Sequence, residues 1–316
     1  MSSRHELRIG EPVCLAATGD ACGEGVLWER GSGCVYWTDI NRFLVHRYRL
    51  KDATLRTWFF PEPVTCVMET SREGTLVLSL GSGVILWEPE TDTRHEPIFR
   101  LPGWPHVRCN DAAVDPRGSL WLGSMRNNVG PDGAPGPVGG WDGMLCRIDG
   151  QEGGNLIQTG VIQTGIGIAN TLVWTANHAK FYFGDSLKNC IWQYDYDLSD
   201  GSIGGERPLF EGFARGVPDG SAIDTDGYVW NCRYGGNCIV RIAPGGEIDR
   251  IVELPVANPT NCTFGGEGGN ILFVTSAHFG QGSWERLGGC LFALETNCVG
   301  VAAGRFKLSS TKLEIK

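Results

Sequence analysis

The segment Asp115-Pro116-Arg117-Gly118-Ser119-Leu120-Trp121-Leu122-Gly123 joins a tight turn to a short β-rich run, and this pairing recurs along the chain. Glycine in such a turn supplies the positive φ that a tight connection needs. Comparable runs cover residues 35–38, 76–79, 120–123, 181–184, 229–232 and 272–275. Their starts lie roughly 41 to 61 residues apart, which is the period of a repeat that contains several strands.

Each repeat contains further strand-like runs. Residues 143–148 and 238–242, for example, alternate apolar and polar side chains, as a strand with one buried face does. Each repeat therefore supplies about four strands, or one blade. The sequence predicts an all-β fold, a six-bladed β-propeller with four-stranded antiparallel blades around a central channel. The 46 glycines and 16 prolines agree with many short strands joined by tight turns.

No stretch of the 316 residues resembles an interdomain linker, so we expect a single domain over residues 1–316, with 1–10 and 307–316 as loose termini. Residues 300–316 also have the character of one or two further strands that would close the ring with N-terminal residues. Residues 126–141 break all periodicity and predict a long loop over one end of the propeller. That loop is either a tolerated surface insertion or the wall or lid of a pocket.

The formal net charge of -9 disfavours binding to nucleic acid and to anionic membrane surfaces, because the summed field repels phosphates. No apolar stretch approaches the roughly 18 residues of a membrane span, and the N-terminus lacks the apolar region of a signal peptide. We therefore expect a cytoplasmic protein without nucleic-acid or membrane partners. We also expect a monomer.

The twelve cysteines lie mostly inside strand-like runs, where small buried thiols are common, so free thiols are expected rather than disulfides. No C-x-x-C pattern is present, and the six histidines show no metal-ligand spacing. Neither a G-x-S-x-G serine nucleophile nor a nucleotide-binding G-x-x-x-x-G-K loop occurs. A thiolate metal site and a serine triad are therefore both disfavoured.

Polar residues concentrate in four loop segments that each immediately precede an apolar run. These segments are Cys22-Gly23-Glu24-Gly25, Arg108-Cys109-Asn110-Asp111, Ile168-Ala169-Asn170-Thr171 and Pro218-Asp219-Gly220. If each segment feeds the innermost strand of its blade, the side chains converge from different blades on the mouth of the channel.

Glu24, Asp219 and Asn170 would then offer two carboxylates and an amide oxygen, a hard oxygen set suited to Ca²⁺, Mg²⁺ or Mn²⁺. Each residue also has an alternative role without a ligand. Glu24 could be a solvated acid in a loop, Asp219 part of a Pro-Asp-Gly turn, and Asn170 the residue that forms an Asx turn. Arg108 and Asn110 suit the hydroxyl or carbonyl oxygens of a polar ligand.

Three stretches together resemble the SMP-30/gluconolactonase/luciferin-regenerating-enzyme (LRE)-like family of six-bladed propellers. They are Cys22-Gly23-Glu24 followed by Leu27-Trp28, Arg108-Cys109-Asn110-Asp111 followed by Val114-Asp115-Pro116-Arg117-Gly118, and Pro218-Asp219-Gly220 followed by Ile223-Asp224. The resemblance extends from about residue 11 to residue 303, which is nearly the whole chain.

The resemblance implies one divalent metal ion held by Glu24, Asn170 and Asp219, with Ca²⁺, Zn²⁺, Mn²⁺, Mg²⁺ and Fe²⁺ all open. It also implies that Arg108 and Asn110 line a sugar pocket. The implied reaction is hydrolysis of an aldonolactone, a pentono- or hexonolactone, to the aldonic acid, and our hypothesis makes Asp219 the catalytic proton acceptor.

Two positions depart from the family pattern. Asn170 is followed by Thr171 where many members have glycine, and Asn128 occupies a position that often carries an acidic substrate contact. Asn128 is therefore a further candidate substrate-binding residue. Two rival functions remain open at this stage: a non-catalytic, metal-binding regulatory propeller, and a related metal-dependent esterase or phosphotriesterase.

Overall fold

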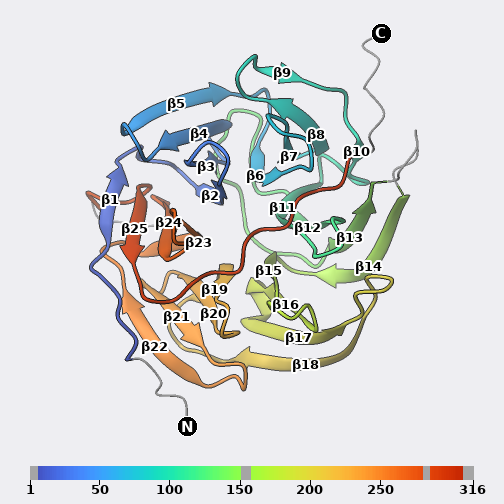
Figure 1. Ribbon diagram of the computed structural model, residues 1–316. Coiled ribbons are helices and arrows are strands. Elements are labelled where there is room, and N and C mark those ends of the chain that lie inside the picture. The colour runs from blue at the N-terminus through green and yellow to red at the C-terminus, as the bar shows by residue number, and fades with distance from the viewer. Residues whose placement is uncertain (1–5, 151–157, 280–284, 309–316) are drawn as a thin grey trace.

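The computed structural model describes residues 6–150, 158–279 and 285–308, and their strands form six antiparallel sheets arranged in a ring (Figure 1). Each sheet is one blade, so the prediction of a six-bladed β-propeller is confirmed. Neighbouring innermost strands contact one another all the way around the central channel.

The blades follow the chain in order. In blades 1 to 5 the innermost strand comes first along the chain, whereas blade 6 takes its outermost strand from N-terminal residues 13–16. Blade 1 contains β2 (Gly23–Glu29), β3 (Cys34–Asp39), β4 (Leu44–Arg49) and β5 (Thr54–Phe59). Blade 2 contains β6 (Val64–Glu69), β7 (Leu76–Leu80), β8 (Gly83–Glu88), β9 (Thr93–Arg94) and β10 (Phe99–Arg100). Blade 3 contains β11 (Val107–Val114), β12 (Leu120–Arg126), β13 (Gly143–Asp149) and β14 (Gln158–Ile166).

Blade 4 contains β15 (Ala169–Trp174), β16 (Lys180–Asp185), β17 (Cys190–Tyr196) and β18 (Ile203–Glu211), with a 3-10 turn, η1 (Ser186–Lys188), between β16 and β17. Blade 5 contains β19 (Val217–Ile223), β20 (Val229–Tyr234), β21 (Cys238–Ile242) and β22 (Ile248–Glu253). Blade 6 contains β23 (Asn258–Gly265), β24 (Ile271–Ala277), β25 (Leu291–Glu295) and β1 (Val13–Ala16).

The turn-and-run motif that defines the repeat is held by an aspartate and a tryptophan. The Trp121 indole donates to Asp115 Oδ2 at 2.9 Å, and the Trp230 indole donates to Asp224 Oδ2 at 3.0 Å. Each aspartate begins the turn, and each fully buried tryptophan lies in the strand that follows it. Because a buried indole N–H needs an acceptor, this bond joins the turn to the core of the blade.

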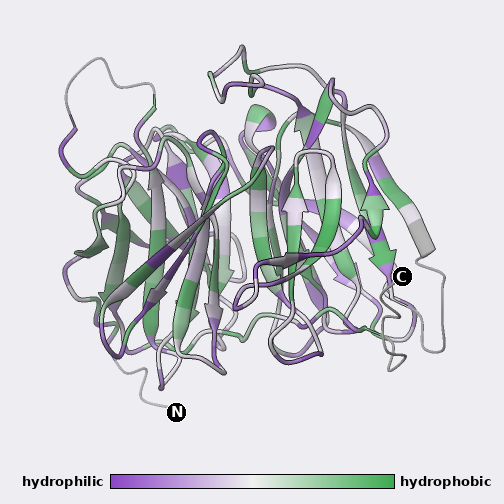
Figure 2. Ribbon diagram, turned by 90° about the horizontal axis from the view of Figure 1, so that it is seen from above, coloured by the Kyte–Doolittle hydropathy of each residue, from purple (hydrophilic) through white to green (hydrophobic). Residues whose placement is uncertain are grey.

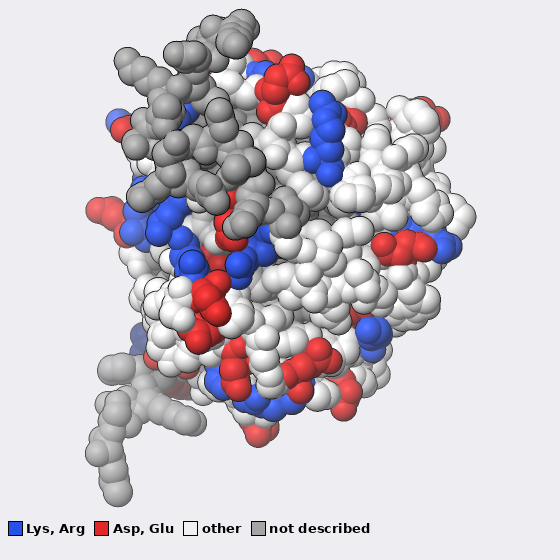
Figure 3. All heavy atoms as spheres, turned by 90° about the vertical axis from the view of Figure 1, so that its right-hand side faces the viewer, with Lys and Arg blue, Asp and Glu red and all other residues white. Residues whose placement is uncertain are grey.

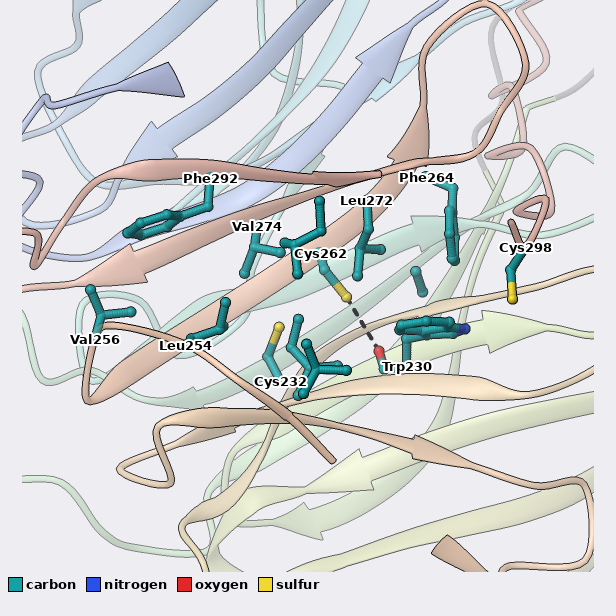
Figure 4. Close-up of a cluster of buried hydrophobic side chains, with 14 of the residues drawn as sticks. Trp230, Cys232, Leu254, Val256, Cys262, Phe264, Leu272, Val274, Phe292 and Cys298 are labelled. Atoms are coloured by element: carbon teal, nitrogen blue, oxygen red, sulfur yellow. Dashed lines mark hydrogen bonds between the residues drawn. The ribbon is translucent and has the colours of Figure 1, made fainter. Parts of the chain in front are cut away.

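The core consists of apolar clusters that fill the space between neighbouring blades. Figure 4 shows the cluster between blades 5 and 6, where Trp230 and Phe264 meet edge to face with ring centroids 5.5 Å apart. Hydrophobic residues follow the strands, whereas hydrophilic residues are frequent in the loops (Figure 2). Because many strands are buried on both faces, their sequences are nearly continuous apolar runs. In β7, for example, every residue is buried.

The ring is closed by its N-terminal strand. β1 pairs antiparallel with β25 and so completes the blade formed by β23, β24 and β25 (Figure 1). The expectation that residues 300–316 add closing strands is wrong for the described part of that run. Residues 300–308 make only isolated bridges, because they cross the channel instead of following a sheet edge. Residues 309–316 lie outside the described residues.

Residues 299–308, the C-terminal strap, cross one end of the channel from blade 5 to blades 2 and 3 (Figure 1). The amide of Val301 donates to the carbonyl of Ile223, and the amide of Phe306 donates to that of Glu69. Phe306 is buried among side chains of blades 2 and 3. The strap therefore covers the end of the channel at which the innermost strands finish.

The described parts of the two termini that were expected to be loose make backbone hydrogen bonds. The amide of Gly10 donates to the carbonyl of Glu295, and the amide of Lys307 donates to that of Gly118. Residues 1–5 of the N-terminus lie outside the described residues.

The loop over residues 126–141 reaches from blade 3 to blade 1. Asn41 Nδ2 donates to the carbonyl of Gly133 at 2.8 Å, and Val129 packs against Ile40 and Phe43. Gly133 has a φ of 80°, and a Cβ there would lie 2.0 Å from the carbonyl oxygen of Asn41, so only glycine fits this contact. The turn at Ile40–Phe43 lies at the channel end opposite the strap, which makes the loop a wall of that mouth.

All twelve cysteines are free thiols, as predicted, and ten of them are buried. Basic and acidic side chains lie close to one another on the face shown in Figure 3, so their fields partly cancel there. Among the described residues, no helix has the length and apolar character needed to cross a membrane.

Candidate functional site

The four polar segments found in the sequence lie at the beginnings of innermost strands. Glu24 belongs to β2, Arg108 and Asn110 to β11, Asn170 to β15, and Asp219 to β19. Because these strands all start at the channel end opposite the strap, the structure brings residues from blades 1, 3, 4 and 5 to one mouth.

A local backbone irregularity accompanies the polar residues in every innermost strand. The register shifts occur between Glu24 and Leu27, Val64 and Cys66, Cys109 and Ala112, Asn170 and Leu172, Pro218 and Ser221, and Pro259 and Cys262. A β-bulge bends the strand and re-aims its side chains, and bulges are frequent next to functional sites. The shared position of these six irregularities builds a ring of polar groups around the channel.

Glu24 is held by two donors on one of its carboxylate oxygens. Its Oε2 accepts hydrogen bonds from the amide of Gly25 at 3.0 Å and from Asn261 Nδ2 at 3.1 Å. Burial raises the pKa of Glu24 to about 7, and the nearby charge of Asp111 acts in the same direction. A carboxylate in this position gains from a nearby cation.

Asp219 is 7% exposed, and side chains of blades 4 and 5 form hydrogen bonds with its backbone. Its carbonyl oxygen accepts from Thr171 Oγ1 at 2.6 Å and from Asn231 Nδ2 at 3.1 Å. Burial raises the pKa of the Asp219 carboxyl well above its usual range, and the charge of Glu24 is the next largest cause. The two carboxyl groups therefore face each other in a poorly solvated space.

Asn170 is 4% exposed, and its amide has a defined orientation. Its Nδ2 donates to Ser186 Oγ at 2.8 Å, and Ser186 Oγ donates in turn to the carbonyl of Pro218 at 2.7 Å. Its Oδ1 lies on the side of Asn110, whose Nδ2 is 3.4 Å away. Since the nitrogen is engaged by Ser186, the oxygen is the atom that Asn170 presents to the channel.

Arg108 is a buried cation whose guanidinium is held by amide and carbonyl oxygens. Its Nε and Nη2 donate to Asn128 Oδ1 at 3.0 and 2.8 Å, and its Nη1 donates to Asn110 Oδ1 at 2.7 Å and to the carbonyl of Cys109 at 2.9 Å. Burial lowers the pKa of Arg108. Asn128 is thus placed as a partner of Arg108 at the start of the 126–141 loop.

The donor set at the mouth fits a divalent cation. Among the described residues, no three His, Cys, Asp or Glu side chains gather as a metal site. Glu24 and Asp219 supply two carboxylates, so a third protein ligand has to be neutral, and the oriented oxygen of Asn170 meets that requirement. Burial raises the pKa of both carboxyl groups, so a nearby cation would favour their charged forms. Hard oxygen ligands of this kind suit Ca²⁺, Mg²⁺ or Mn²⁺.

Sequence reasoning missed two polar residues at this site, Asn261 and the carboxylate of Asp111. Asn261 contacts Glu24 directly, and Asp111 is a buried carboxyl whose pKa burial raises to about 6. The sequence contained a signal for Asn261. Pro259-Thr260-Asn261 occupies the same position in the innermost strand of blade 6 as Pro218-Asp219-Gly220 does in that of blade 5. Asp111 belongs to the polar segment Arg108-Cys109-Asn110-Asp111, in which only Arg108 and Asn110 were predicted to bind a ligand.

A cavity of about 310 Å³ lies in the channel behind the polar ring, on the side of the strap. Its walls include Asp111 and Asn261 near the ring, and Val301–Gly304 of the strap at the other end. The strap borders this side of the channel, whereas Glu24, Asn170 and Asp219 lie toward the mouth that the 126–141 loop borders.

Comparisons with known proteins agree with this geometry. A model of the SMP-30/Gluconolactonase/LRE-like region matches residues 22–278. L-Arabinolactonase of Azospirillum brasilense is 31% identical over 307 residues, a match that covers 94% of this chain and 96% of that protein. 6-Deoxy-6-sulfogluconolactonase of Pseudomonas putida is 28% identical over 300 residues, with 93% and 97% covered. Among solved structures, a luciferin-regenerating enzyme matches with a TM-score of 0.83 at 27% identity, covering 96% of this chain and 100% of that one.

Proposed function

The chain belongs to the SMP-30/gluconolactonase/LRE-like family, and from that premise we propose that it is a metal-dependent sugar lactonase. The proposed reaction is hydrolysis of a pentono- or hexonolactone to its aldonic acid. The observation that carries the proposal is the pair of carboxyl groups, partly buried Glu24 and buried Asp219, beside the oriented amide of Asn170. The two sugar lactonases that match nearly the whole chain support the substrate class.

In this proposal Glu24, Asn170 and Asp219 hold one divalent cation. When bound, such an ion supplies Lewis-acid polarisation of a carbonyl oxygen, which stabilises the negative charge that develops during attack by water. Glu24 and Asn170 serve as ligands only. Their hydrogen bonds to Asn261 and Ser186 keep the ligand atoms in place before substrate arrives.

Asp219 has the second role of proton acceptor. As water adds to the lactone carbonyl, one water proton passes to the Asp219 carboxylate, and the ring C–O bond then breaks with that proton delivered to the departing alkoxide. The products are one carboxyl group and one hydroxyl group, so the net change is the addition of one water molecule.

Arg108 and Asn110 bind and orient the substrate. The guanidinium is fixed by Asn128 and Asn110, so little rotamer freedom is lost when a hydroxyl or carbonyl oxygen accepts a hydrogen bond from it. Asn128 acts on the substrate mainly through Arg108 in this proposal.

We further propose a monomer that acts on a diffusible sugar lactone in the cytoplasm. Twelve free cysteines support a reducing compartment, where thiols persist. Light scattering coupled to size-exclusion chromatography would test the oligomeric state.

The proposed activity is tested by proton release from a panel of aldonolactones. The protein is stripped with a chelator, single divalent metals are added back, and the spontaneous rate is subtracted. Acyl lactones, simple esters and organophosphates complete the panel. Metal-dependent acceleration on a sugar lactone is the expected result. Turnover of only the other esters would make the protein an esterase or phosphotriesterase, and metal binding without any turnover would make it a regulatory propeller.

A further inference from the structure

We propose that Asn261 is a positioning residue for the metal site, which orients the carboxylate of Glu24 and packs against the strand that carries Asp219. The inference rests on the proposed function, because it concerns the same three ligands. Asn261 comes from blade 6, a blade that supplies none of the proposed ligands.

The Asn261 amide is fixed at both ends. The residue is 7% exposed, and its Oδ1 accepts a hydrogen bond from the amide of Cys262 at 2.8 Å. That bond leaves the Nδ2 group to donate to Glu24 Oε2 at 3.1 Å. The backbone amide of Asn261 also donates to Thr275 Oγ1 at 3.2 Å, which ties the residue to β24. The side chain therefore cannot turn its oxygen toward Glu24 without losing a buried hydrogen bond.

The hydrogen bond decides which oxygen of Glu24 is free. Asn261 Nδ2 and the amide of Gly25 both donate to Oε2, within 3.1 and 3.0 Å. A carboxylate oxygen with two donors has little capacity left for a cation, so Oε1 is the oxygen that Glu24 offers. Asn261 thus fixes the orientation of the Glu24 carboxylate and leaves Oε1 as its available oxygen.

Asn261 also packs against the backbone next to Asp219. A Cβ on Gly220 would lie 2.2 Å from Asn261 Cγ and 2.5 Å from Asn261 Nδ2. Gly220 directly follows Asp219 in β19, so its missing side chain makes room for the amide. Asn261 is therefore wedged between Glu24 of blade 1 and the Asp219 segment of blade 5, and it sets the separation of the two carboxylates.

The expected consequence of losing this amide is weaker metal binding. Residues that orient metal ligands from outside the ligand shell typically change metal affinity about 10- to 100-fold when they are replaced. Asn261→Ala would free Glu24 to reorient and would open space beside Gly220.

Calorimetric titration of the full-length, chelator-stripped protein with Ca²⁺ and with Mn²⁺ tests the proposal. The matched control is Asn258→Ala, because Asn258 is a buried amide in the same strand and its side chain bonds to the backbone of Gly235 and Phe279. We expect Asn261→Ala to weaken metal affinity about 10- to 100-fold and Asn258→Ala to leave it within about twofold. Equal affinities in wild type and Asn261→Ala would overturn the inference.

A second variant separates positioning from a general loss of structure. Gly220→Ala keeps the Asn261 amide but pushes it away, so it should also weaken metal affinity. In the Asn261→Ala background the same change meets no amide and should have a smaller effect. Additive effects in this cycle would overturn the inference. If wild-type protein binds neither metal, the proposed function fails with it, whereas wild-type binding that is unaffected by either substitution sinks only the role of Asn261.

Discussion

At the scale of single residues, the site brings together two carboxyl groups, Glu24 and Asp219, whose charged forms burial disfavours. Glu24 and Asp219 come from different blades. Among the residues that the structure describes, neither carboxyl group forms a salt bridge with a lysine, arginine or histidine. Arg108 is close enough to lower the pKa of Glu24, but it is a minor cause. In the proposed function, a cation at the polar ring would compensate these two carboxylates.

Asp219→Asn should abolish most of the lactonase activity while the fold is retained. The substitution keeps the shape of the side chain and the backbone bonds from Thr171 and Asn231, but it removes the proton acceptor and one charged ligand. A general base contributes typically 10²- to 10⁴-fold, so we expect turnover to fall by at least about 100-fold. Steady-state kinetics and circular dichroism measure the two effects, and unchanged turnover would rule out the assigned role.

Arg108→Ala should chiefly weaken substrate binding. The guanidinium contacts Asn110 and Asn128 but carries none of the proposed ligand or proton-transfer roles. We expect KM to rise about tenfold with a smaller change in kcat. The control is Arg126→Ala, because Arg126 is an exposed arginine of β12 that pairs with Asp142. A large loss in kcat at unchanged KM would contradict the assignment.

At the scale of the strand and its turn, Asp224 fixes a connection of blade 5 at the channel end away from the proposed ligands. Asp224 opens a turn and accepts hydrogen bonds from the amides of Asp226 and Tyr228, from the Trp230 indole, and from Arg241. Asp224 and Arg241 are 1% and 6% exposed, and their closest charged atoms are 2.7 Å apart. The aspartate therefore links one turn to two strands of blade 5.

Asp224→Ala should destabilise the protein without changing its metal affinity. The substitution leaves the buried Trp230 indole and the turn amides without their acceptor, while Arg241 keeps its second partner, Asp249, so we expect a loss of about 1–3 kcal/mol. Asp226→Ala, an exposed position in the same turn, is the control and should change stability by less than about 0.5 kcal/mol. Denaturant titration gives the free energies of unfolding, and similar values for both variants would argue against the role of Asp224.

At the scale of the whole molecule, the propeller is a ring whose blades must be held together. β1 closes the ring by pairing with β25, the strap crosses one end of the channel, and the 126–141 loop crosses to blade 1 at the other end. The proposed ligands come from blades 1, 4 and 5. A cation at the polar ring would therefore join three blades.

Saturating metal should stabilise the stripped protein. A ligand that binds only the folded state contributes about 2.7 kcal/mol at a concentration 100 times its dissociation constant. We expect the midpoint of thermal unfolding to rise with added metal in wild-type protein and to rise much less in Glu24→Gln. A midpoint that does not depend on metal would count against a site that spans these blades.

The local pattern of the sequence determined the architecture, because each repeat carries its own turns and apolar runs, and four of the six repeats carry a polar segment at the start of the innermost strand. For the same reason, Glu24, Arg108, Asn110, Asn170 and Asp219 could be proposed together: the repeats place equivalent positions at the same end of the channel. The resemblance to a known family then selected the metal ligands among them.

Only the tertiary structure decided the contacts between segments that are distant in the chain. The contact of Asn261 with Glu24 spans 237 residues, and the contact of Asn128 with Arg108 depends on where the irregular 126–141 loop returns. Likewise, residues 300–308 have the composition of a strand but cross the channel, since β1 already occupies the open edge of blade 6. Such pairings depend on which surfaces meet after the ring has formed, and no local propensity encodes that choice.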